Sequence, residues 1–395
     1  MLLTPQVGGR VLHFGVGLLF NIEMANLTCP VCGGKMKGHG KTAAGAKRWQ
    51  CMSCSMTSTR KTDNTAKRSK RFLEWLLSKK TQAEMGMSAR SFRRATSEFW
   101  NIWPIAPLCD EIHRVVHVDG IWLGRQAVVL IACAGDYVIG WHLARSENSQ
   151  AWAALMARIA PPDAVVADGG SGFEKARRAV WPDTRVQRCL FHAFEQVKRC
   201  TTTRPKLQAG VEMYGIAKDL MRVKDLDGAA VWLAGFSSWC TRWDDFLKEK
   251  TLVDGAVKFK HERLRKARRG LEKLAREGTL FTYLDESLSE AGEIPATNNR
   301  IEGGVNRQLR IVLNEHRGMS ITRRIKALFW WCLMHSEERP SEAEILREMP
   351  TDEQIASLYR SLGNTQEPDD AVLQWGTAIS YHELHAGGTY RIDYD

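Results

Sequence analysis

The chain has 395 residues, of which 44% are hydrophobic and 26% charged, and it contains 32 Gly and 12 Pro. This length predicts roughly two to four domains, and the composition excludes a mostly disordered, a collagen-like or a low-complexity chain. The formal net charge of +11 favours a polyanionic partner such as nucleic acid.

Residues 1–26 are expected to be a leader or a disordered segment, and Met24 is an alternative start of translation. The segment lacks the basic region and the small-residue cleavage site of a signal peptide. No apolar run has the length of a membrane span, so no membrane association is expected. We therefore expect a cytoplasmic protein whose cysteines are thiols or metal ligands rather than disulfides.

Residues 27–62 carry two Cys-x-x-Cys pairs, Cys29/Cys32 and Cys51/Cys54, with eighteen residues between them. Two tight turns that each supply two thiolates are typical of a tetrahedral zinc site, so we predict a zinc ribbon with one structural zinc ion. Four buried free cysteines are the alternative, which the spacing disfavours. The basic and aromatic residues between the pairs favour nucleic acid, although such ribbons also bind proteins. The cations expected to contact DNA here are Lys47 and Arg48.

Residues 63–104 predict three short helices in a helix-turn-helix arrangement. An apolar stripe over residues 72–77 marks the first helix, and Gly86 ends a short second one. Ser88 can cap the third helix, whose basic side chains would contact DNA. Those side chains are Arg90, Arg93 and Arg94. Three helices that pack for stability alone are the alternative interpretation.

Charge is unevenly distributed along the chain. Residues 29–100 hold 16 Lys or Arg against 4 Asp or Glu, whereas residues 337–395 hold 4 against 13. Clustered cations neutralise phosphates, which supports DNA binding by the amino-terminal part, and a solvated basic face is the alternative. We interpret residues 337–395 as an acidic tail that either covers the basic surface or holds a protein contact.

Residues 110–200 alternate strands and helices in the manner of an α/β domain. We expect the first strand to end on Asp119 and another to end on Asp168, so both carboxylates would lie at the carboxyl edge of one sheet. Either aspartate alone would more often be a turn or cap residue. His117 lies two residues before Asp119 and so on the same face of the strand, as a neighbour of the site.

Residues 296–336 supply a third acid, Glu302, near the start of a helix that Thr297 or Asn298 can cap. Asn306 falls at helical spacing from Glu302 and shares its polar face. An exposed glutamate on a surface helix is the alternative interpretation.

Together these motifs resemble the DDE transposases of the Mutator-like group, found in bacterial insertion sequences. The resemblance covers residues 110–335 and rests on VHVDG, VVADGG, Cys189-Leu-Phe-His192 and NNRIEGGVNRQLR. A zinc ribbon and a helix-turn-helix ahead of this region agree with bacterial members of the group.

The resemblance implies a ribonuclease H-like core in which Asp119, Asp168 and Glu302 hold two Mg²⁺ or Mn²⁺ ions. Two such ions about 4 Å apart can activate an attacking oxygen and stabilise a leaving oxygen in an in-line displacement. The implied reaction is phosphodiester hydrolysis at the element ends, followed by attack of the freed 3′-hydroxyl on target DNA.

Cys189 and His192 have no second pair nearby, so they do not make a complete zinc site by themselves. A buried thiol and an imidazole that orient a strand and a helix are one interpretation, and contact of His192 with the scissile phosphate is another. We count His192 among the candidate catalytic residues and leave it out of the ligand set.

Residues 201–295 are helix-rich, and the resemblance implies an all-helical insertion there. Three tryptophans at spacings of seven and four predict a core face, namely Trp232, Trp239 and Trp243. Residues 258–276 form a strongly basic helix that either faces solvent or contacts DNA. On the helix of the third acid, the cations expected to contact DNA are Arg307 and Arg310.

We therefore predict a transposase that binds the terminal inverted repeats of its own element in double-stranded DNA. It would act as a homodimer or larger assembly on DNA and associate with the bacterial nucleoid. A transposase-derived DNA-binding regulator without catalysis and a metal-dependent structure-selective nuclease are the main alternatives. An RNA-binding zinc-ribbon protein is a third.

Overall fold

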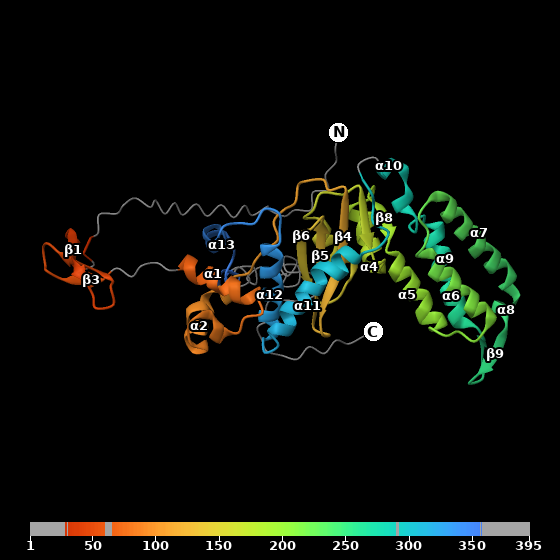
Figure 1. Ribbon diagram of the computed structural model, residues 1–395, viewed down its shortest axis with the longest axis horizontal. Coiled ribbons are helices and arrows are strands. Elements are labelled where there is room, and N and C mark those ends of the chain that lie inside the picture. The colour runs from red at the N-terminus through yellow and green to blue at the C-terminus, as the bar shows by residue number, and fades with distance from the viewer. Residues whose placement is uncertain (1–27, 30, 60–64, 290–291, 356, 358–395) are drawn as a thin grey trace, which may run out of the picture. The chain divides into compact units, whose positions relative to one another are not determined.

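The computed structural model describes residues 28–29, 31–59, 65–289, 292–355 and 357 (Figure 1). Its chain divides into two compact units, Met1–Thr65 and Ala66–Asp395. The fold is mixed α/β, as the sequence predicts. The expected leader, residues 1–26, lies outside the described residues, and so does the acidic tail from residue 358 onward.

The first unit is built around a three-stranded antiparallel sheet. Strands β1 (Met36–Lys41), β2 (Lys47–Cys51) and β3 (Thr57–Thr59) lie in the order β1-β2-β3. In the described part of this unit, the only buried hydrophobic residues are Cys29 and Cys51. So small a sheet has no hydrophobic core of its own, and its stability depends on the cysteine cluster.

The second unit contains a five-stranded sheet in the order β6-β5-β4-β7-β8. Strands β4 (Val115–Leu123), β5 (Ala127–Ala134) and β6 (Tyr137–Ala144) form an antiparallel meander. Strands β7 (Ala164–Ala167) and β8 (Arg185–Arg188) continue the sheet in parallel with β4. Every residue of β5 is buried, because the strand lies in the middle of the meander with a hydrophobic core on each face.

The expectation that Asp119 ends its strand is wrong. Strand β4 runs on to Leu123, because β5 pairs with it over that whole length. Strand β7, in contrast, pairs with β4 only from Val115 to His117. Asp119 therefore lies where the parallel pairing stops, although its own strand continues.

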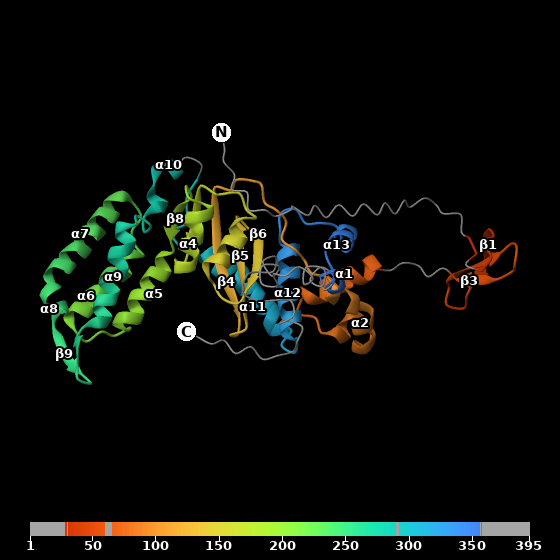
Figure 2. The same ribbon diagram turned by 180° about the vertical axis from the view of Figure 1, so that it is seen from behind.

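Helices cover both faces of the sheet (Figures 1 and 2). On one face, α3 (Ser149–Met156) and α4 (Ser171–Val180) share a core with β4, β5 and β7. On the other face lie α11 (Asn306–Glu315) and α12 (Ile321–Met334). Helix α12 is buried from Ile325 to Leu333 without interruption, because it packs against the sheet and against the amino-terminal helices of the unit.

These amino-terminal helices are α1 (Thr65–Leu76), η1 (Gln82–Met85), α2 (Ala89–Thr96) and η2 (Ser97–Asn101). The predicted apolar stripe of α1 is buried in the core that contains α12. The predicted second helix is a single 3₁₀ turn, η1, which ends at Gly86 with φ of +75°. The Ser88 hydroxyl caps α2 by accepting the Ser91 N–H at 3.2 Å.

The segment after η2 packs against the core, and it holds the first part of the acidic tail in place. Trp103 is completely buried and donates its Nε1–H to Asp352 Oδ1 at 2.6 Å. Helix α13 (Glu342–Glu348) precedes that aspartate, and Ile345 and Ile355 join the same core. The described beginning of the tail is thus part of the folded second unit.

A helical subdomain follows β8, and its long helices lie side by side (Figures 1 and 2). They are α5 (Leu190–Thr201), α6 (Gln208–Leu220), α7 (Leu226–Arg242) and α9 (Glu262–Arg276). The predicted tryptophan face lies in their shared core. Between α7 and α9 come the short α8 (Asp244–Lys248) and the two-stranded sheet of β9 (Lys250–Val253) and β10 (Ala256–Phe259). The segment is therefore mostly but not entirely helical, and η3 (Thr282–Leu284) and α10 (Glu286–Ser289) complete it.

The last turn before α11 has π-helical geometry. This element, η4 (Arg300–Val305), contains Glu302, Gly303 and Gly304. A π turn holds one residue more than an α turn and is often found at functional sites.

Candidate functional site

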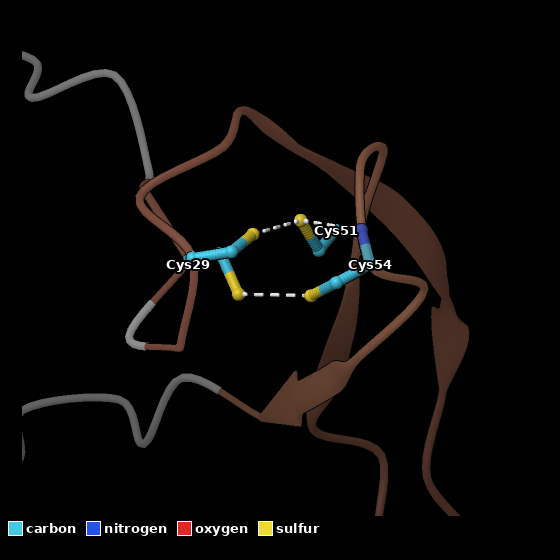
Figure 3. Close-up of side chains that lie close together, drawn as sticks. Cys29, Cys51 and Cys54 are labelled. Carbon is cyan, nitrogen blue, oxygen red and sulfur yellow. Dashed lines mark hydrogen bonds between the residues drawn. The ribbon is translucent and has the colours of Figure 1, made fainter.

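The four predicted zinc ligands of the first unit lie together. Their sulfur atoms are all within 4.8 Å of one another, and Figure 3 shows the side chains of Cys29, Cys51 and Cys54 pointing toward one another. The Cys29 and Cys54 sulfurs are 3.6 Å apart, and those of Cys32 and Cys51 are 3.4 Å apart. Four thiolates around a zinc ion are separated by about 3.8 Å. The cluster therefore could hold a structural zinc ion.

Backbone N–H groups lower the pKa of two of the four thiols, whereas the neighbouring sulfurs raise the pKa of Cys54. The N–H groups of Cys54 and Ser53 point at the Cys51 sulfur and lower the pKa of this thiol to about 6. The Cys29 thiol has a lowered pKa for the same reason. Gly33 adopts a φ of +68°, the unusual backbone that a metal-binding turn needs. Thiolates are the form of cysteine that binds metals.

In the second unit, Asp119 and Asp168 each follow the last residue pair of the β4–β7 ladder by two positions. That pair is His117 of β4 and Val166 of β7. Side chains two residues apart point to the same face of a strand. Both carboxylates therefore lie on one face at the end of the β4–β7 pairing.

The charges of three other carboxylates act on the carboxyl group of Asp119. Burial, together with the negative charges of Asp168, Glu302 and Glu147, raises the pKa of Asp119 to about 7. The Gly120 N–H, which donates to Oδ1 at 2.8 Å, opposes this shift. A group of acids that repel one another in a half-buried place is a typical setting for divalent cations.

Two asparagines connect the segment of Glu302 to strand β4. Asn306 is completely buried, and its Nδ2–H donates to Asp119 Oδ2 at 2.6 Å. Asn298 donates from Nδ2 to the Val118 carbonyl at 2.9 Å, and its Oδ1 lies 2.9 Å from His117 Nδ1. The suggested side-chain cap by Asn298 is therefore not formed, because this side chain bonds to the sheet instead.

His192 and Cys189 lie beside Glu302. His192 Nδ1 is 3.3 Å from Glu302 Oε1, and the Cys189 sulfur accepts the Asn298 N–H at 3.2 Å. Burial raises the pKa of the Cys189 thiol, and burial also lowers the pKa of His117. His117 is thus a buried neighbour of Asp119 that bonds to Asn298.

Among the residues that the structure describes, only two groups of three or more His, Cys, Asp or Glu residues have ligand atoms that all lie within 4.8 Å of one another. One is the cysteine cluster, and the other is Cys189, His192 and Glu302. Glu302 is therefore close enough to act on Asp119 electrostatically, but its carboxylate is grouped with the thiol and the imidazole.

Two residues near the aspartates were missed by the sequence reasoning. Glu147 accepts a hydrogen bond from Trp122 Nε1–H at 2.7 Å, and burial and the charge of Asp168 raise its pKa. A Cβ at Gly120 would clash with this carboxylate, so the glycine leaves room for it. Arg188 is 8% exposed and lies against Gly169, next to Asp168. Arg188 ends β8, the strand beside β7, and this position could have indicated that it lies near Asp168.

The cations predicted to contact DNA are exposed in both units. They are Lys47 and Arg48 in the first unit, and Arg90, Arg93, Arg94, Arg307 and Arg310 in the second. Arg93 lines a pocket of about 470 Å³ together with Arg317 and Arg323. The basic segment 258–276 is different, because Arg268 pairs with Asp244 and Glu272, and Arg269 pairs with Glu262.

No protein-family model matches the chain, and no curated protein matches it. In the part of the chain that is described, no helix combines the length and the apolar character needed to cross a membrane.

Proposed function

We propose that the chain is a metal-dependent DNA transposase, with Asp119, Asp168 and Glu302 as the acids of its active site. The observation that supports the proposal is that Asp119 lies within electrostatic reach of both Asp168 and Glu302. Asp119 and Asp168 each lie two positions beyond the last β4–β7 residue pair, and the charges of Asp168 and Glu302 both act on Asp119. The three acids lie 49 to 183 positions apart in the sequence. Acids that share a partly buried place and have perturbed pKa values are typical of functional sites.

We propose a ribonuclease H-like core for the five-stranded sheet. An antiparallel meander followed by two parallel strands supports it, as do helices on both faces. Asp119 and Asp168 lie just past the end of the parallel pairing, which is where ligands bind in α/β sheets.

The donor set fits two Mg²⁺ or Mn²⁺ ions, because carboxylate oxygens are the ligands these ions prefer. When bound, such ions activate an attacking oxygen and stabilise a leaving oxygen. Asn306 would hold the Asp119 carboxylate in a fixed orientation through its Nδ2–H. Arg188 would offer a positive charge to a phosphate beside Asp168, since its Nε and Nη1 have no hydrogen-bond partner within the described residues.

We propose that DNA is recognised by α1, η1 and α2 as a helix-turn-helix and by the ribbon. The exposed arginines of α2 would face the duplex, and Arg317 and Arg323 border the same pocket as Arg93. Phosphate contacts by such cations give an affinity that falls as the salt concentration rises.

The test uses purified full-length chain, labelled DNA of the element ends and Mg²⁺. We expect Asp119→Asn, Asp168→Asn and Glu302→Gln each to abolish cleavage and strand transfer while end binding is retained. Asp183→Asn, at an exposed acid after α4, serves as the matched control and should keep both activities.

The same assay separates the alternatives. Cleavage by any of the three variants would contradict the assignment of that acid. End binding without cleavage by the unmodified chain would favour a DNA-binding regulator. Cutting of branched DNA without rejoining would favour a structure-selective nuclease.

A further inference from the structure

Cys189, His192 and Glu302 form a second cluster of metal-ligating side chains, separate from the cysteine cluster of the first unit. Their sulfur, nitrogen and oxygen atoms all lie within 4.8 Å of one another. Cys189 is completely buried, whereas the side chains of His192 and Glu302 are 24% and 25% exposed. The cluster thus has a closed side formed by the thiol and an open side toward solvent.

The chain fold holds the three groups in place from two directions. Cys189 is the N-cap residue of α5, and His192 follows three residues later in its first turn. Residues three apart in a helix lie on the same face. Glu302 comes from η4, and the Asn298 N–H bond to the Cys189 sulfur fixes the start of that segment against α5.

The contact between His192 and Glu302 is not a satisfied hydrogen bond. Their Nδ1 and Oε1 atoms are 3.3 Å apart, yet neither atom has a hydrogen-bond partner in the described part of the chain. Buried polar atoms without partners are uncommon and call for an explanation such as an ion. Two such atoms that converge beside a sulfur are arranged as ligands of a common cation.

We propose that Cys189, His192 and Glu302 bind a thiophilic divalent cation of the zinc class. One sulfur, one nitrogen and one oxygen ligand suit zinc, whereas Mg²⁺ takes oxygen ligands. Ligand atoms around tetrahedral zinc are about 3.5 Å apart, so small side-chain rotations close the present spacing. Three protein ligands leave the fourth position to water or to a substrate oxygen.

This site has a consequence for the proposed active site. A cation held by Cys189 and His192 keeps the Glu302 carboxylate on their side and away from the two aspartates. Zinc would then oppose Mg²⁺-dependent cleavage. This consequence rests on the proposed function, whereas the cation site itself does not.

The experiment counts zinc in the full chain. The protein is equilibrated with buffered free zinc, separated from unbound metal and analysed for zinc per chain by mass spectrometry. We expect two zinc ions in the unmodified chain and one in Cys189→Ser and in His192→Ala. Cys200→Ser is the matched control, because Cys200 lies near the other end of the same helix, and it should keep two.

Cobalt gives a second readout that does not depend on the count. Co²⁺ bound to a thiolate has a charge-transfer absorption, and Cys189→Ser should lose the part that the ribbon cysteines do not supply. Loss of a residue that hydrogen-bonds to a metal ligand lowers metal affinity roughly 10- to 100-fold. Cys189→Ser removes a ligand itself, so its affinity for the second ion should fall by more than that.

Two results would overturn the proposal. One is a single zinc ion in the unmodified chain, and the other is a second ion that both variants retain. If Cys189→Ser fails to fold, judged by circular dichroism, the partly exposed His192 variant decides the matter. Loss of transposase activity plays no part in this reading, so the two proposals fail separately.

Discussion

The carboxyl group of Asp119 combines burial with the repulsion of neighbouring acids. Both raise its pKa, and within the described residues only the Gly120 N–H and the Asn306 amide donate hydrogen bonds to it. The aspartates themselves could be predicted, because each follows a short apolar run. Their register could not, because it depends on how β4 and β7 pair, and the paired residues are 49 positions apart in the chain.

Glu147 contributes to this group of acids, so its charge should matter for metal binding. We expect Glu147→Gln to lower Mg²⁺-dependent cleavage by roughly 10- to 100-fold and to raise the Mg²⁺ concentration needed. The amide keeps the size of the side chain and can still accept the Trp122 N–H. The measurement is cleavage of end DNA over a Mg²⁺ titration.

Glu174→Gln is the control for this change, because Glu174 lies on α4 and pairs with Arg177 and Arg178. It should leave the Mg²⁺ dependence unaltered. An unchanged titration curve for Glu147→Gln would mean that this carboxylate is outside the site. The sequence offered no motif for Glu147, which lies in the turn between β6 and α3.

His142 on β6 should make folding sensitive to acid. Burial, aided by the positive charge of Arg158, lowers its pKa from 6.5 to about 4. The unfolded chain then binds a proton that the folded chain excludes, so stability is lost as the pH falls from 6.5 toward 4. At pH 5 the loss from this residue is about 2 kcal/mol.

The measurement is urea unfolding at pH 7 and pH 5 for the unmodified chain and for His142→Leu. The imidazole Nε2 has no hydrogen-bond partner among the described residues, so leucine costs no bond there. We expect the variant to lose less stability on acidification. His39→Gln, at an exposed position of the ribbon, should behave like the unmodified chain, and equal acid sensitivity in all three would refute the assignment.

At the scale of elements, local signals predicted well where a single turn decides the structure. The Ser88 cap and the Gly86 stop are both formed as expected. Signals that depend on partners far away in the chain were less informative. The basic segment 258–276 is one example, because its cations meet acids of α8 and of α9 itself, which charge counting could not anticipate.

Lys326 on α12 connects three elements from a buried position. It is 1% exposed, and its Nζ donates to Asp352 Oδ1 at 2.8 Å and to the Trp100 carbonyl. We expect Asp352→Leu to destabilise the chain by about 2–3 kcal/mol, because it leaves an ammonium group buried without a countercharge. Chemical unfolding measures this change.

The double variant Lys326→Met/Asp352→Leu is the informative comparison. Removing both charges at once avoids the uncompensated ammonium, so most of the lost stability should return. A double variant as unstable as Asp352→Leu alone would show that the aspartate acts through Trp103 rather than through the lysine.

At the scale of the whole molecule, the chain consists of two units that are stabilised in different ways. The second has extended hydrophobic cores on both faces of its sheet, whereas the described part of the first has almost none. Composition predicted several domains, and the cysteine spacing located the first of them. Composition could not reveal that residues 337–355 belong to the folded core, because the negative charge of this segment resembles that of a disordered acidic tail.

Zinc removal should therefore unfold one unit only, because the unit that holds the proposed second ion at Cys189 has hydrophobic cores of its own. We expect a strong chelator to unfold residues 28–59, because the binding energy of a structural zinc ion is folding energy in a unit without a core. Hydrogen exchange measures this, with fast exchange in β1 and β2 and unchanged protection in β4 and β5. Cys51→Ser should reproduce the effect without chelator. Equal loss of protection in β5 would contradict the independence of the units.

The wide turn at Arg300–Val305 carries a mechanical implication. Its two glycines have open space where a side chain would be, so the backbone there is sterically unconstrained. If the turn tightened to ordinary α geometry, it would hold one residue fewer. The chain before it, including Glu302, would then rotate by about 100° around the helix axis. Asn306 follows the turn and would keep its hydrogen bond to Asp119. The Glu302 carboxylate would thus change direction while the Asp119 carboxylate stays in place.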